Sequence, residues 1–280
     1  MRIGRFEVDG VERIGRFIDS SVIDVSSGFS TFTDALSDPS GAADINDGEY
    51  PLDEISYLPP TGPGNTVFCA ALNYQAHADE ADDAVPDRPL IFLKLARTLV
   101  GNLSPIAYHT KVTEEIDYEA ELAAVIGSPA RHVSPEAALD HVAGYTILND
   151  TSARDLQLGL PVGDDTLFDW FSGKAMQATT PVGPYVVADE IDDPQDLDIT
   201  STVNGEVMQD SNTGLMIRSV ADLISFVSSR VQLEPGDIIA TGTPEGVGTF
   251  QDIRLHHGDE VEIEVEGIGT LVNWVEETTD

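Results

Sequence analysis

The sequence predicts a mostly β fold of mixed α/β type, and two observations lead to it. Short apolar runs rich in β-branched and aromatic residues recur over most of the chain, and clusters of Gly, Pro and Asp separate them. Helical periodicity is confined to a few short segments. The 280 residues allow one large domain with ample core, or such a domain with a small appendage.

The N-terminal part is expected to be a small separate segment. Arg2–Phe6 and Arg13–Phe17 repeat the same Arg-Ile-Gly-Arg-Phe string around an Asp-Gly turn, which predicts a β-hairpin. Ser, Asp, Gly and Pro dominate the stretch that follows, with one short helix expected around Phe32–Leu36. A Pro-Pro-Thr-Gly-Pro string then indicates a linker. We therefore expect a hairpin and cap over residues 1–60 and the main domain over residues 61–280.

The main domain carries most of the strand pattern. Two helices are expected within it, over Pro135–Asp140 with Ser134 as cap and over Ser219–Ser228. The predicted strands are Leu90–Lys94, Tyr118–Ile126, Ala143–Leu148, Val182–Val187, Ile199–Val203, Ile238–Thr241, Val261–Val265 and Thr270–Val275.

The charge of the chain is extreme, because 50 acidic residues stand against 14 basic ones and the formal net charge is −36. The acids are dispersed, and Lys94, Lys111 and Lys174 are the only lysines. Such a surface fits a protein that stays soluble in multimolar salt, where screening over about 3 Å removes self-repulsion. We expect a halophilic source, such as a halophilic archaeon. The alternative is a protein that mimics nucleic acid with its acidic surface, and the patterned core argues against it. A protein that binds nucleic acid is also not expected, because the chain has no basic patch to contact phosphates.

The cysteine content and hydropathy bear on location. Cys69 lies in an apolar run and is expected to be a buried small hydrophobic residue without a disulfide partner in the chain. No apolar stretch is long enough to cross a membrane, and the first residues lack the apolar core of a signal peptide. These features predict a protein of the reducing cytoplasm.

Three carboxylates on otherwise apolar strands are the strongest chemical signal. Glu119 and Glu121 alternate along the predicted strand Tyr118–Ile126, so both side chains project from one face. Asp150 ends the next apolar run and could complete a set of three oxygen ligands. A hard divalent cation such as Mg²⁺ requires such a set. The alternative is that Glu-x-Glu lies on a solvated strand face of an acidic chain.

A second candidate group follows the apolar run at residues 66–72. His77 and Glu80 are i, i+3 neighbours on a predicted helical turn, so the carboxylate can hold the imidazole and raise its basicity. Beside a divalent cation, such a pair can deprotonate a water molecule that attacks a carbonyl group. The alternative is an exposed pair without a chemical role.

Three further features give weaker signals. Arg154 could bind a ligand carboxylate, or it could form a salt bridge to Asp155 or to a metal ligand. Lys174 is retained in a lysine-poor chain, which favours a specific charge–charge role. The Gly-rich string Thr241–Gly248 has neither the Lys-Ser/Thr of a phosphate loop nor the Rossmann spacing, and it fits a rigid turn that presents Thr243 and backbone N–H groups.

Motifs that follow one another in a fixed order point to one family. They are Asn73-Tyr-x-x-His77-x-x-Glu80, Phe92-Leu-Lys94, Asp117-Tyr-Glu-x-Glu-Leu, Gly144-Tyr-x-x-x-Asn-Asp150-x-Ser-Ala-Arg154-Asp-Leu-Gln157, Gly173-Lys174, Gln209-Asp-Ser-Asn-Thr213 and Thr241-Gly-Thr-Pro-x-Gly246. This order resembles the fumarylacetoacetate hydrolase family over roughly residues 60–275. The chain departs from the family at Ala71, where glycine is common, and at Gly-Lys-Ala175-Met176, where Gly-Lys-Ser-Phe is frequent; both bear on the shape of the substrate site.

The resemblance implies a fold and a metal site. The family has a mixed β-sandwich roll, here the catalytic domain, and its members are usually homodimers. They hold Mg²⁺ or Mn²⁺ through three carboxylates, which match Glu119, Glu121 and Asp150.

The resemblance also implies roles for other residues. His77 and Glu80 match the pair that activates water in the hydrolase and decarboxylase branches. Gln157, Lys174 and Thr243 match positions that contact the head group of a 2-oxo acid, and Lys174 would add positive charge beside the substrate oxygens.

The prediction is therefore a metal-dependent, homodimeric cytoplasmic hydrolase or lyase that cleaves a C–C bond of a 2-oxo acid such as an acylpyruvate or oxaloacetate. Alternatives are a 2-hydroxyhepta-2,4-diene-1,7-dioate isomerase or decarboxylase of aromatic catabolism, and a dehydratase of a 2-keto-3-deoxy sugar acid. The His–Glu pair argues against dehydration, because β-elimination needs no activated water. A non-catalytic acidic scaffold belongs to a different class and predicts no saturable Mg²⁺ site. Neither nucleic acid nor membrane is expected as a partner.

Overall fold

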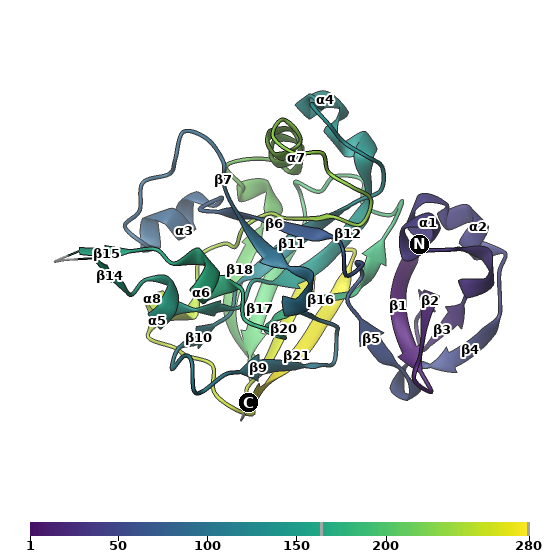
Figure 1. Cartoon of the computed structure of the whole chain (residues 1–280), viewed down its shortest axis with the longest axis horizontal. Helices are drawn as coiled ribbons and strands as arrows, with labels where there is room; N and C mark the ends of the chain where they lie inside the picture. The colour runs from purple at the N-terminus through teal and green to yellow at the C-terminus, as the bar shows by residue number, and fades with distance from the viewer. Residues whose placement is uncertain (163–164, 279–280) are drawn as a thin grey trace.

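Two β-sheets form the frame of the computed structural model, which describes residues 1–162 and 165–278. The larger sheet runs through β4 (Gly48–Pro51), β3 (Ser21–Asp24), β2 (Val11–Ile18), β1 (Arg2–Val8), β16 (Thr180–Val187), β12 (Val142–Asn149), β11 (Ala120–Ile126), β19 (Ile238–Ala240), β6 (Thr66–Ala71) and β7 (Leu90–Leu95), with β5 (Ser56–Leu58) beside β1 and β8 (Leu99–Val100) beside β16. The smaller sheet runs through β18 (Glu206–Asn212), β17 (Asp198–Val203), β20 (Glu260–Val265), β21 (Gly269–Glu277) and β9 (Pro105–Tyr108). This architecture confirms the predicted mostly β fold (Figure 1).

Shorter elements complete the chain. Two strand pairs are formed by β10 (Ile116–Asp117) with β13 (Ser152–Ala153) and by β14 (Leu160–Val162) with β15 (Asp165–Leu167). The helices are α1 (Phe32–Ser37), α2 (Pro39–Ala43), α3 (Gln75–Glu80), α4 (Pro135–Ala138), α5 (Arg154–Gln157), α6 (Trp170–Lys174), α7 (Val220–Ser228) and α8 (Gly248–Gln251). Single 3-10 turns are η1 (Ser26–Gly28), η2 (Leu52–Glu54), η3 (Ala96–Thr98), η4 (Leu139–His141) and η5 (Thr213–Leu215).

Strand direction brings the candidate residues to one edge of the larger sheet. β11 pairs antiparallel with β12 and with β19, and β19 pairs parallel with β6. The start of β11 therefore lies beside the ends of β12, β19 and β6. Glu119 directly precedes β11, whereas the chain leaves the other three strands at Asp150, Thr241 and Leu72.

Alternation along β11 separates an apolar face from an acidic one, as predicted. Ala120 and Leu122 belong to the core between the two sheets, together with residues of β17, β20 and β21. Glu119 and Glu121 project from the opposite face, because successive side chains of a strand alternate. Ala123 lies on the same face of β11 and belongs to a second core, which α1 and the N-terminal strands cover.

Most predicted elements are confirmed. β1 and β2 form the predicted hairpin with Phe6 opposite Arg13, and each predicted strand and helix of the main domain has a counterpart. α7 begins after Ser219, whose hydroxyl accepts a hydrogen bond from the backbone N–H of Asp222 in a capping box. β11 begins at Ala120 rather than at the predicted Tyr118, because the N–H of Glu119 bonds the Asn149 side chain instead of a neighbouring strand.

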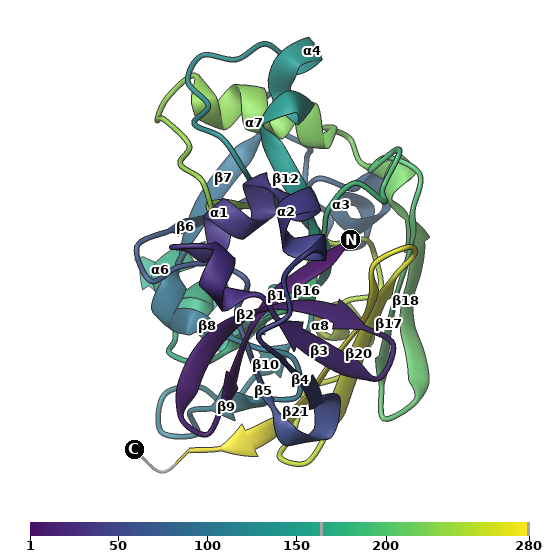
Figure 2. The same cartoon turned by 90° about the vertical axis from the view of Figure 1, so that its right-hand side faces the viewer.

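The N-terminal segment holds more strands than predicted. β3, β4 and β5 follow the hairpin where the sequence indicated mainly loop. β1 pairs with β16 and so joins this segment to the main sheet, while the boundary near residue 60 stays a prediction. Figure 2 shows its strands with α1 and α2 above them. None of the helices in the described residues has the length and apolar character needed to cross a membrane.

Candidate active site

Three buried carboxylates meet at the edge where β11 starts and β12 ends. One oxygen from each of Glu119, Glu121 and Asp150 lies within 4.8 Å of the others. Their exposed fractions are 6%, 1% and 1%, respectively. The backbone N–H of Asp150 donates to the carbonyl of Glu119 over 2.9 Å, which holds the two chain segments together. The predicted convergence of these residues is therefore present.

Cationic side chains from three different elements surround the carboxylates. Lys174 Nζ lies 2.9 Å from Glu119 Oε2 and 2.6 Å from Asp150 Oδ2. Lys94 Nζ, which is fully buried, lies 2.7 Å from Asp150 Oδ1. Arg154 Nη2 lies 2.7 Å from Glu119 Oε1. This pairing offsets part of the large cost of burying ionised groups.

The surroundings separate the pKa values of the two glutamates. Burial raises the pKa of Glu119, but attraction to Lys174 and Arg154 outweighs it, and the pKa falls below its ordinary value. Burial, with repulsion from Asp150 and Glu119, raises the pKa of Glu121 well above its ordinary value. The backbone N–H of Gly242 donates to Glu121 Oε2 over 2.9 Å and opposes this rise. In the part of the chain that the structure describes, Glu119 and Asp150 form ion pairs with lysine, whereas Glu121 forms none.

The donor set fits a hard divalent cation. Glu119, Glu121 and Asp150 offer converging carboxylate oxygens, the ligands that Mg²⁺ and Mn²⁺ prefer. A cation at this point would also relieve the repulsion that raises the pKa of Glu121. The assignment of these three residues as ligands stays a prediction.

The predicted His–Glu pair lies on α3. His77 Nδ1 is 2.8 Å from Glu80 Oε1, and the backbone N–H of Gly246 donates to Glu80 Oε2 over 3.0 Å. Since an ionised carboxylate can only accept, the proton of a neutral His77 belongs on Nδ1. Its Nε2 is then left with a lone pair that can accept a proton.

Gln157 and Thr243 are both held so that they can donate. Gln157 Oε1 accepts a hydrogen bond from Arg154 Nη1 over 2.8 Å, which leaves the amide N–H groups of Gln157 for a ligand. Thr243 Oγ1 accepts from Gln209 Nε2 over 2.8 Å, so its own proton is also available. Both residues therefore suit a ligand that carries only acceptor oxygens, such as a carboxylate or an oxo group.

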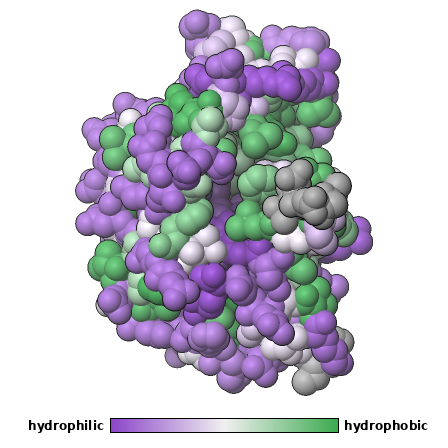
Figure 3. All heavy atoms as spheres, turned by 90° about the vertical axis from the view of Figure 1, so that its left-hand side faces the viewer, coloured by the Kyte–Doolittle hydropathy of each residue, from purple (hydrophilic) through white to green (hydrophobic). Residues whose placement is uncertain are grey.

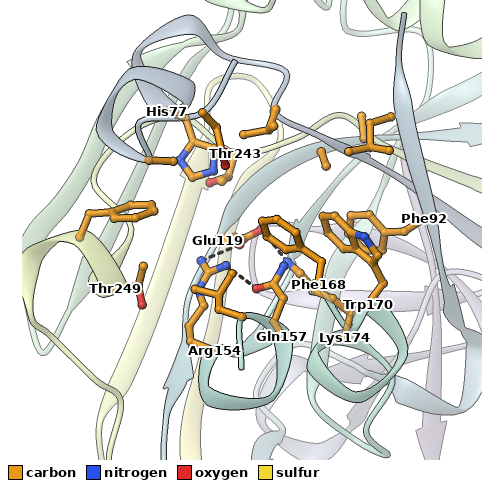
Figure 4. A pocket seen from close by; sticks show the side chains of 18 residues that line it. His77, Phe92, Glu119, Arg154, Gln157, Phe168, Trp170, Lys174, Thr243 and Thr249 are labelled. Atoms are coloured by element: carbon orange, nitrogen blue, oxygen red, sulfur yellow. Dashed lines mark hydrogen bonds and ion pairs between the residues drawn. The ribbon is translucent and has the colours of Figure 1, made fainter. Parts of the chain in front are cut away.

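These groups face one cavity of about 360 Å³. His77, Glu119, Gln157, Lys174 and Thr243 all contribute to its lining. Figure 4 shows His77 and Thr243 on one side, with Gln157 and Lys174 across from them. The cavity opens on the face shown in Figure 3, where hydrophobic residues border a hollow.

The structure decides some of the open alternatives. Glu119 and Glu121 do not lie on a solvated face, and His77 with Glu80 is a partly buried pair at the cavity. Arg154 pairs with Asp117 and Glu119, so the salt bridge to a ligand candidate is present and the one to Asp155 is not formed. Arg154 also lines the cavity.

Several residues of the site were not predicted from the sequence. Lys94 contacts Asp150; its rarity in this chain and the Phe92-Leu-Lys94 motif marked it in the sequence, but neither assigned it a role. Asp117 is fully buried and accepts hydrogen bonds from Arg154 and from the N–H groups of Gly248 and Thr249, so it ties α5 to the start of α8. Phe92, Trp170 and Phe168 form an aromatic wall, and no pattern in the sequence predicted the contact of these three rings.

A mixed β frame that brings buried carboxylates, paired cations and a His–Glu pair to one cavity defines an enzyme scaffold. The chain belongs to the fumarylacetoacetate hydrolase family: the family description Fumarylacetoacetate (FAA) hydrolase C-terminal matches residues 66–276. Members of this family are enzymes, among them hydrolases, isomerases and tautomerases.

Named relatives cover most of the chain. The mitochondrial oxaloacetate tautomerase FAHD2A of Bos taurus is 41% identical over 228 residues, which are 80% of this chain and 71% of that protein. The structure of a fumarylacetoacetate hydrolase from psychrophilic Exiguobacterium antarcticum is 37% identical with a TM-score of 0.82, covering 99% of this chain and 100% of that one. The structure of a 2-hydroxyhepta-2,4-diene-1,7-dioate isomerase from Mycobacterium marinum is 33% identical with a TM-score of 0.81, covering 100% of both chains.

Proposed function

We propose that this protein is a divalent-metal-dependent enzyme that cleaves a C–C bond of a 2-oxo acid, by hydrolysis of an acylpyruvate or by decarboxylation of oxaloacetate. The observation that carries the proposal is that Glu119, which clusters with Glu121 and Asp150, lines the same cavity as the imidazole of His77. Mg²⁺ or Mn²⁺ held by these carboxylates would act as a Lewis acid toward the oxygen of a developing enolate.

The charge of the buried cluster supports a bound cation and an anionic head group. The charged side chains of the cluster are Asp117, Glu119, Glu121, Asp150, Lys94, Arg154 and Lys174. When all are ionised, the carboxylates exceed the cations by one charge. A divalent cation would reverse the sign, and the carboxylate of a 2-oxo acid would then neutralise the site.

The donors of the chain suit that head group. Lys174 places a buried ammonium beside Glu119 and Asp150, where it would attract the carboxylate and oxo oxygens of the substrate. The free N–H groups of Gln157 and the hydroxyl proton of Thr243 would orient the same oxygens. A head group made only of acceptors would satisfy all three side chains.

Hydrolysis of an acylpyruvate uses the His77–Glu80 pair. His77 Nε2 would take a proton from water as its oxygen adds to the distal carbonyl carbon, and Glu80 would stabilise the imidazolium. The bond from that carbon to C3 then breaks, and its electron pair becomes the enolate of pyruvate. Return of the proton to C3 gives a carboxylic acid and pyruvate. Loss of CO₂ from oxaloacetate yields the same enolate without attack by water.

Keto–enol tautomerisation of oxaloacetate is a second candidate function, and the 41% identity to the oxaloacetate tautomerase of Bos taurus favours it. In that reaction His77 would remove a proton from C3, and a proton would be delivered to the oxo oxygen. The enolate is common to both reactions, whereas C–C cleavage is confined to the first.

The test is product analysis with metal-stripped protein in molar KCl, to which Mg²⁺ or Mn²⁺ is returned. Acetylpyruvate, fumarylpyruvate, oxaloacetate and a 2-keto-3-deoxypentonate are followed by NMR. Metal-dependent formation of pyruvate supports C–C cleavage, and metal-dependent enol exchange without pyruvate supports tautomerisation. Dehydration alone, or full activity of a Glu119→Ala/Glu121→Ala variant, would overturn the proposal.

A further inference from the structure

Tyr118, the residue before Glu119, holds a turn of the chain beside the cavity. Its side chain is fully buried, and its hydroxyl donates to the carbonyl of Gly246 over 3.1 Å. Gln251 Nε2 donates to the same carbonyl, but Gln251 is exposed, so water can replace this bond. Gly246 has a φ of 96°, and a Cβ built on it would lie 2.3 Å from the carbonyl oxygen of Met208, so only glycine fits there. The orientation of the backbone at Gly246 is therefore fixed.

Asp117, the residue before Tyr118, holds the segment that follows this turn. Its Oδ1 accepts from the backbone N–H of Gly248 over 2.8 Å, and its Oδ2 accepts from that of Thr249 over 3.1 Å. These N–H groups belong to the first turn of α8, where a helix leaves its donors without partners of its own. Asp117 thus stabilises the start of α8 from outside the helix.

The turn and α8 contact both members of the His–Glu pair. The backbone N–H of Gly246 donates to Glu80 Oε2 over 3.0 Å, and Glu80 Oε1 lies 2.8 Å from His77 Nδ1. The ring of Phe250, on α8, meets the ring of His77 at an interplanar angle of 60°, with the centroids 6.2 Å apart. The place of the pair therefore depends on a segment that the residues before Glu119 hold.

We propose that Tyr118 is a positioning residue for the His–Glu pair. Its hydroxyl holds Gly246, Gly246 holds Glu80, and Glu80 holds the proton of His77 on Nδ1. Because Tyr118 directly precedes Glu119, one stretch of backbone carries both a proposed metal ligand and the anchor of the base. Tyr118 is not among the described residues that line the cavity, so it acts through this chain of contacts. The inference rests on the proposed function, in which His77 deprotonates water.

The first experiment removes only the hydroxyl that holds Gly246. We expect Tyr118→Phe to lower kcat for acylpyruvate hydrolysis by about three- to ten-fold, the worth of one hydrogen bond, and to change KM by less than about two-fold. Metal-dependent decarboxylation of oxaloacetate should keep its kcat, because CO₂ leaves without attack by water. The matched control is Tyr108→Phe, since the buried Tyr108 also donates to a carbonyl, that of Glu114, over 3.1 Å.

The outcomes of this experiment separate the inference from the proposed function. Unchanged hydrolysis by Tyr118→Phe, or an equal loss in hydrolysis and decarboxylation, would overturn the inference. Absence of metal-dependent C–C cleavage by the native chain would instead overturn the proposed function.

A second variant displaces the turn itself. Gly246→Ala must move the peptide group that donates to Glu80, so kcat for hydrolysis should fall by about ten- to a hundred-fold. Gly258→Ala is the matched control: Gly258 has a similar φ of 90°, and a Cβ built on it meets none of the described residues within 4 Å apart from its neighbours in the chain. Equal hydrolysis by the two variants would contradict a role of the turn.

A spectroscopic measurement tests the positioning without turnover. The ¹⁵N chemical shifts of the His77 ring report which nitrogen carries the proton, and His77→Asn assigns its signals. In the Mg²⁺-loaded native protein we expect a neutral ring with the proton on Nδ1. Tyr118→Phe and Gly246→Ala should move part of the population to the Nε2 tautomer, because Glu80 is held less firmly, whereas the two control variants should not. An unchanged tautomer population in Tyr118→Phe would overturn the inference whatever reaction the native chain catalyses.

Discussion

Gln209 Nε2 donates to Thr243 Oγ1 over 2.8 Å and thereby directs the hydroxyl proton of Thr243 away from Gln209. The orientation of the amide is fixed, because Gln209 Oε1 accepts from the backbone N–H of Ala120 and Nε2 also donates to the carbonyl of Pro244. Gln209 lies on β18 in the smaller sheet, and it thus orients the hydroxyl group of Thr243 in a turn at the edge of the larger sheet. If Thr243 contacts the head group as proposed, Gln209 acts as a positioning residue for it.

Removing the hydroxyl of Thr243 should therefore weaken substrate binding. We expect Thr243→Val to raise KM by about ten-fold, the worth of one hydrogen bond to a charged group, with a smaller effect on kcat. Thr243→Ser keeps the hydroxyl and should restore KM. Gln209→Glu can only accept, so it should also raise KM, and it should add little in a Thr243→Val background. Additive effects in the double variant would show that Gln209 does not act through Thr243.

The raised pKa of Glu121 predicts how the stability of metal-free protein depends on pH. The folded state keeps this proton to a higher pH than the unfolded chain does, so the contribution of Glu121 to the free energy of unfolding falls as pH rises above the ordinary value of 4.5. Glu121→Gln removes this contribution. As the pH rises from about 5 to about 8, the Tm of the Glu121→Gln variant should fall less than the Tm of the native chain, as measured by calorimetry with chelator present. Glu206→Gln, at an exposed position on β18, is the control; parallel curves for Glu121→Gln and the native chain would contradict the prediction.

The His77–Glu80 pair should matter for hydrolysis more than for decarboxylation. His77→Asn is expected to lower kcat for acylpyruvate hydrolysis by about 10²–10⁴-fold, because it removes the base that deprotonates water. Decarboxylation of oxaloacetate should lose much less, since CO₂ leaves without attack by water. Exposed His256 provides the control substitution, His256→Asn. Unchanged hydrolysis by His77→Asn would exclude this residue as the base.

The net charge of −36 predicts a stability that depends on salt. Like charges repel over about 10 Å at 0.1 M salt and over only about 3 Å at 1 M. The Tm should therefore rise as KCl is increased to about 1 M and beyond, and an equal ionic strength of NaCl should act similarly. A Tm that is independent of salt over this range would contradict a role of screening.

Local patterns predicted the parts of the site that lie close together in the sequence. The alternation of Glu119 and Glu121 along a strand, and the i, i+3 spacing of His77 and Glu80, are set by backbone geometry alone. The mostly β fold followed from the same periodicities. Strands β3, β4 and β5 were not predicted, because they are short and rich in polar or turn-forming residues.

Residues brought together by sheet order could not be predicted in this way. Lys94 on β7 contacts Asp150 at the end of β12 although β11, β19 and β6 separate these two strands in the sheet. The stack of Phe92 on Trp170 depends on the docking of α6 against β7. Neither relationship has a signal in the sequence around the residue. The homodimer, the halophilic source and the cytoplasmic location stay predictions.

The central claim is that Glu119, Glu121 and Asp150 hold a divalent cation at the cavity. The most direct measurement is a Mn²⁺ titration of metal-stripped protein in molar KCl, followed by electron paramagnetic resonance, with the native chain and Glu121→Gln side by side. The account predicts one saturable Mn²⁺ site per chain. Glu121→Gln should strongly weaken Mn²⁺ binding at this site, and Glu206→Gln should not. The signal of the bound Mn²⁺ should change when a 2-oxo acid is added. Equal binding by the native chain and Glu121→Gln, or no saturable site at all, would contradict it.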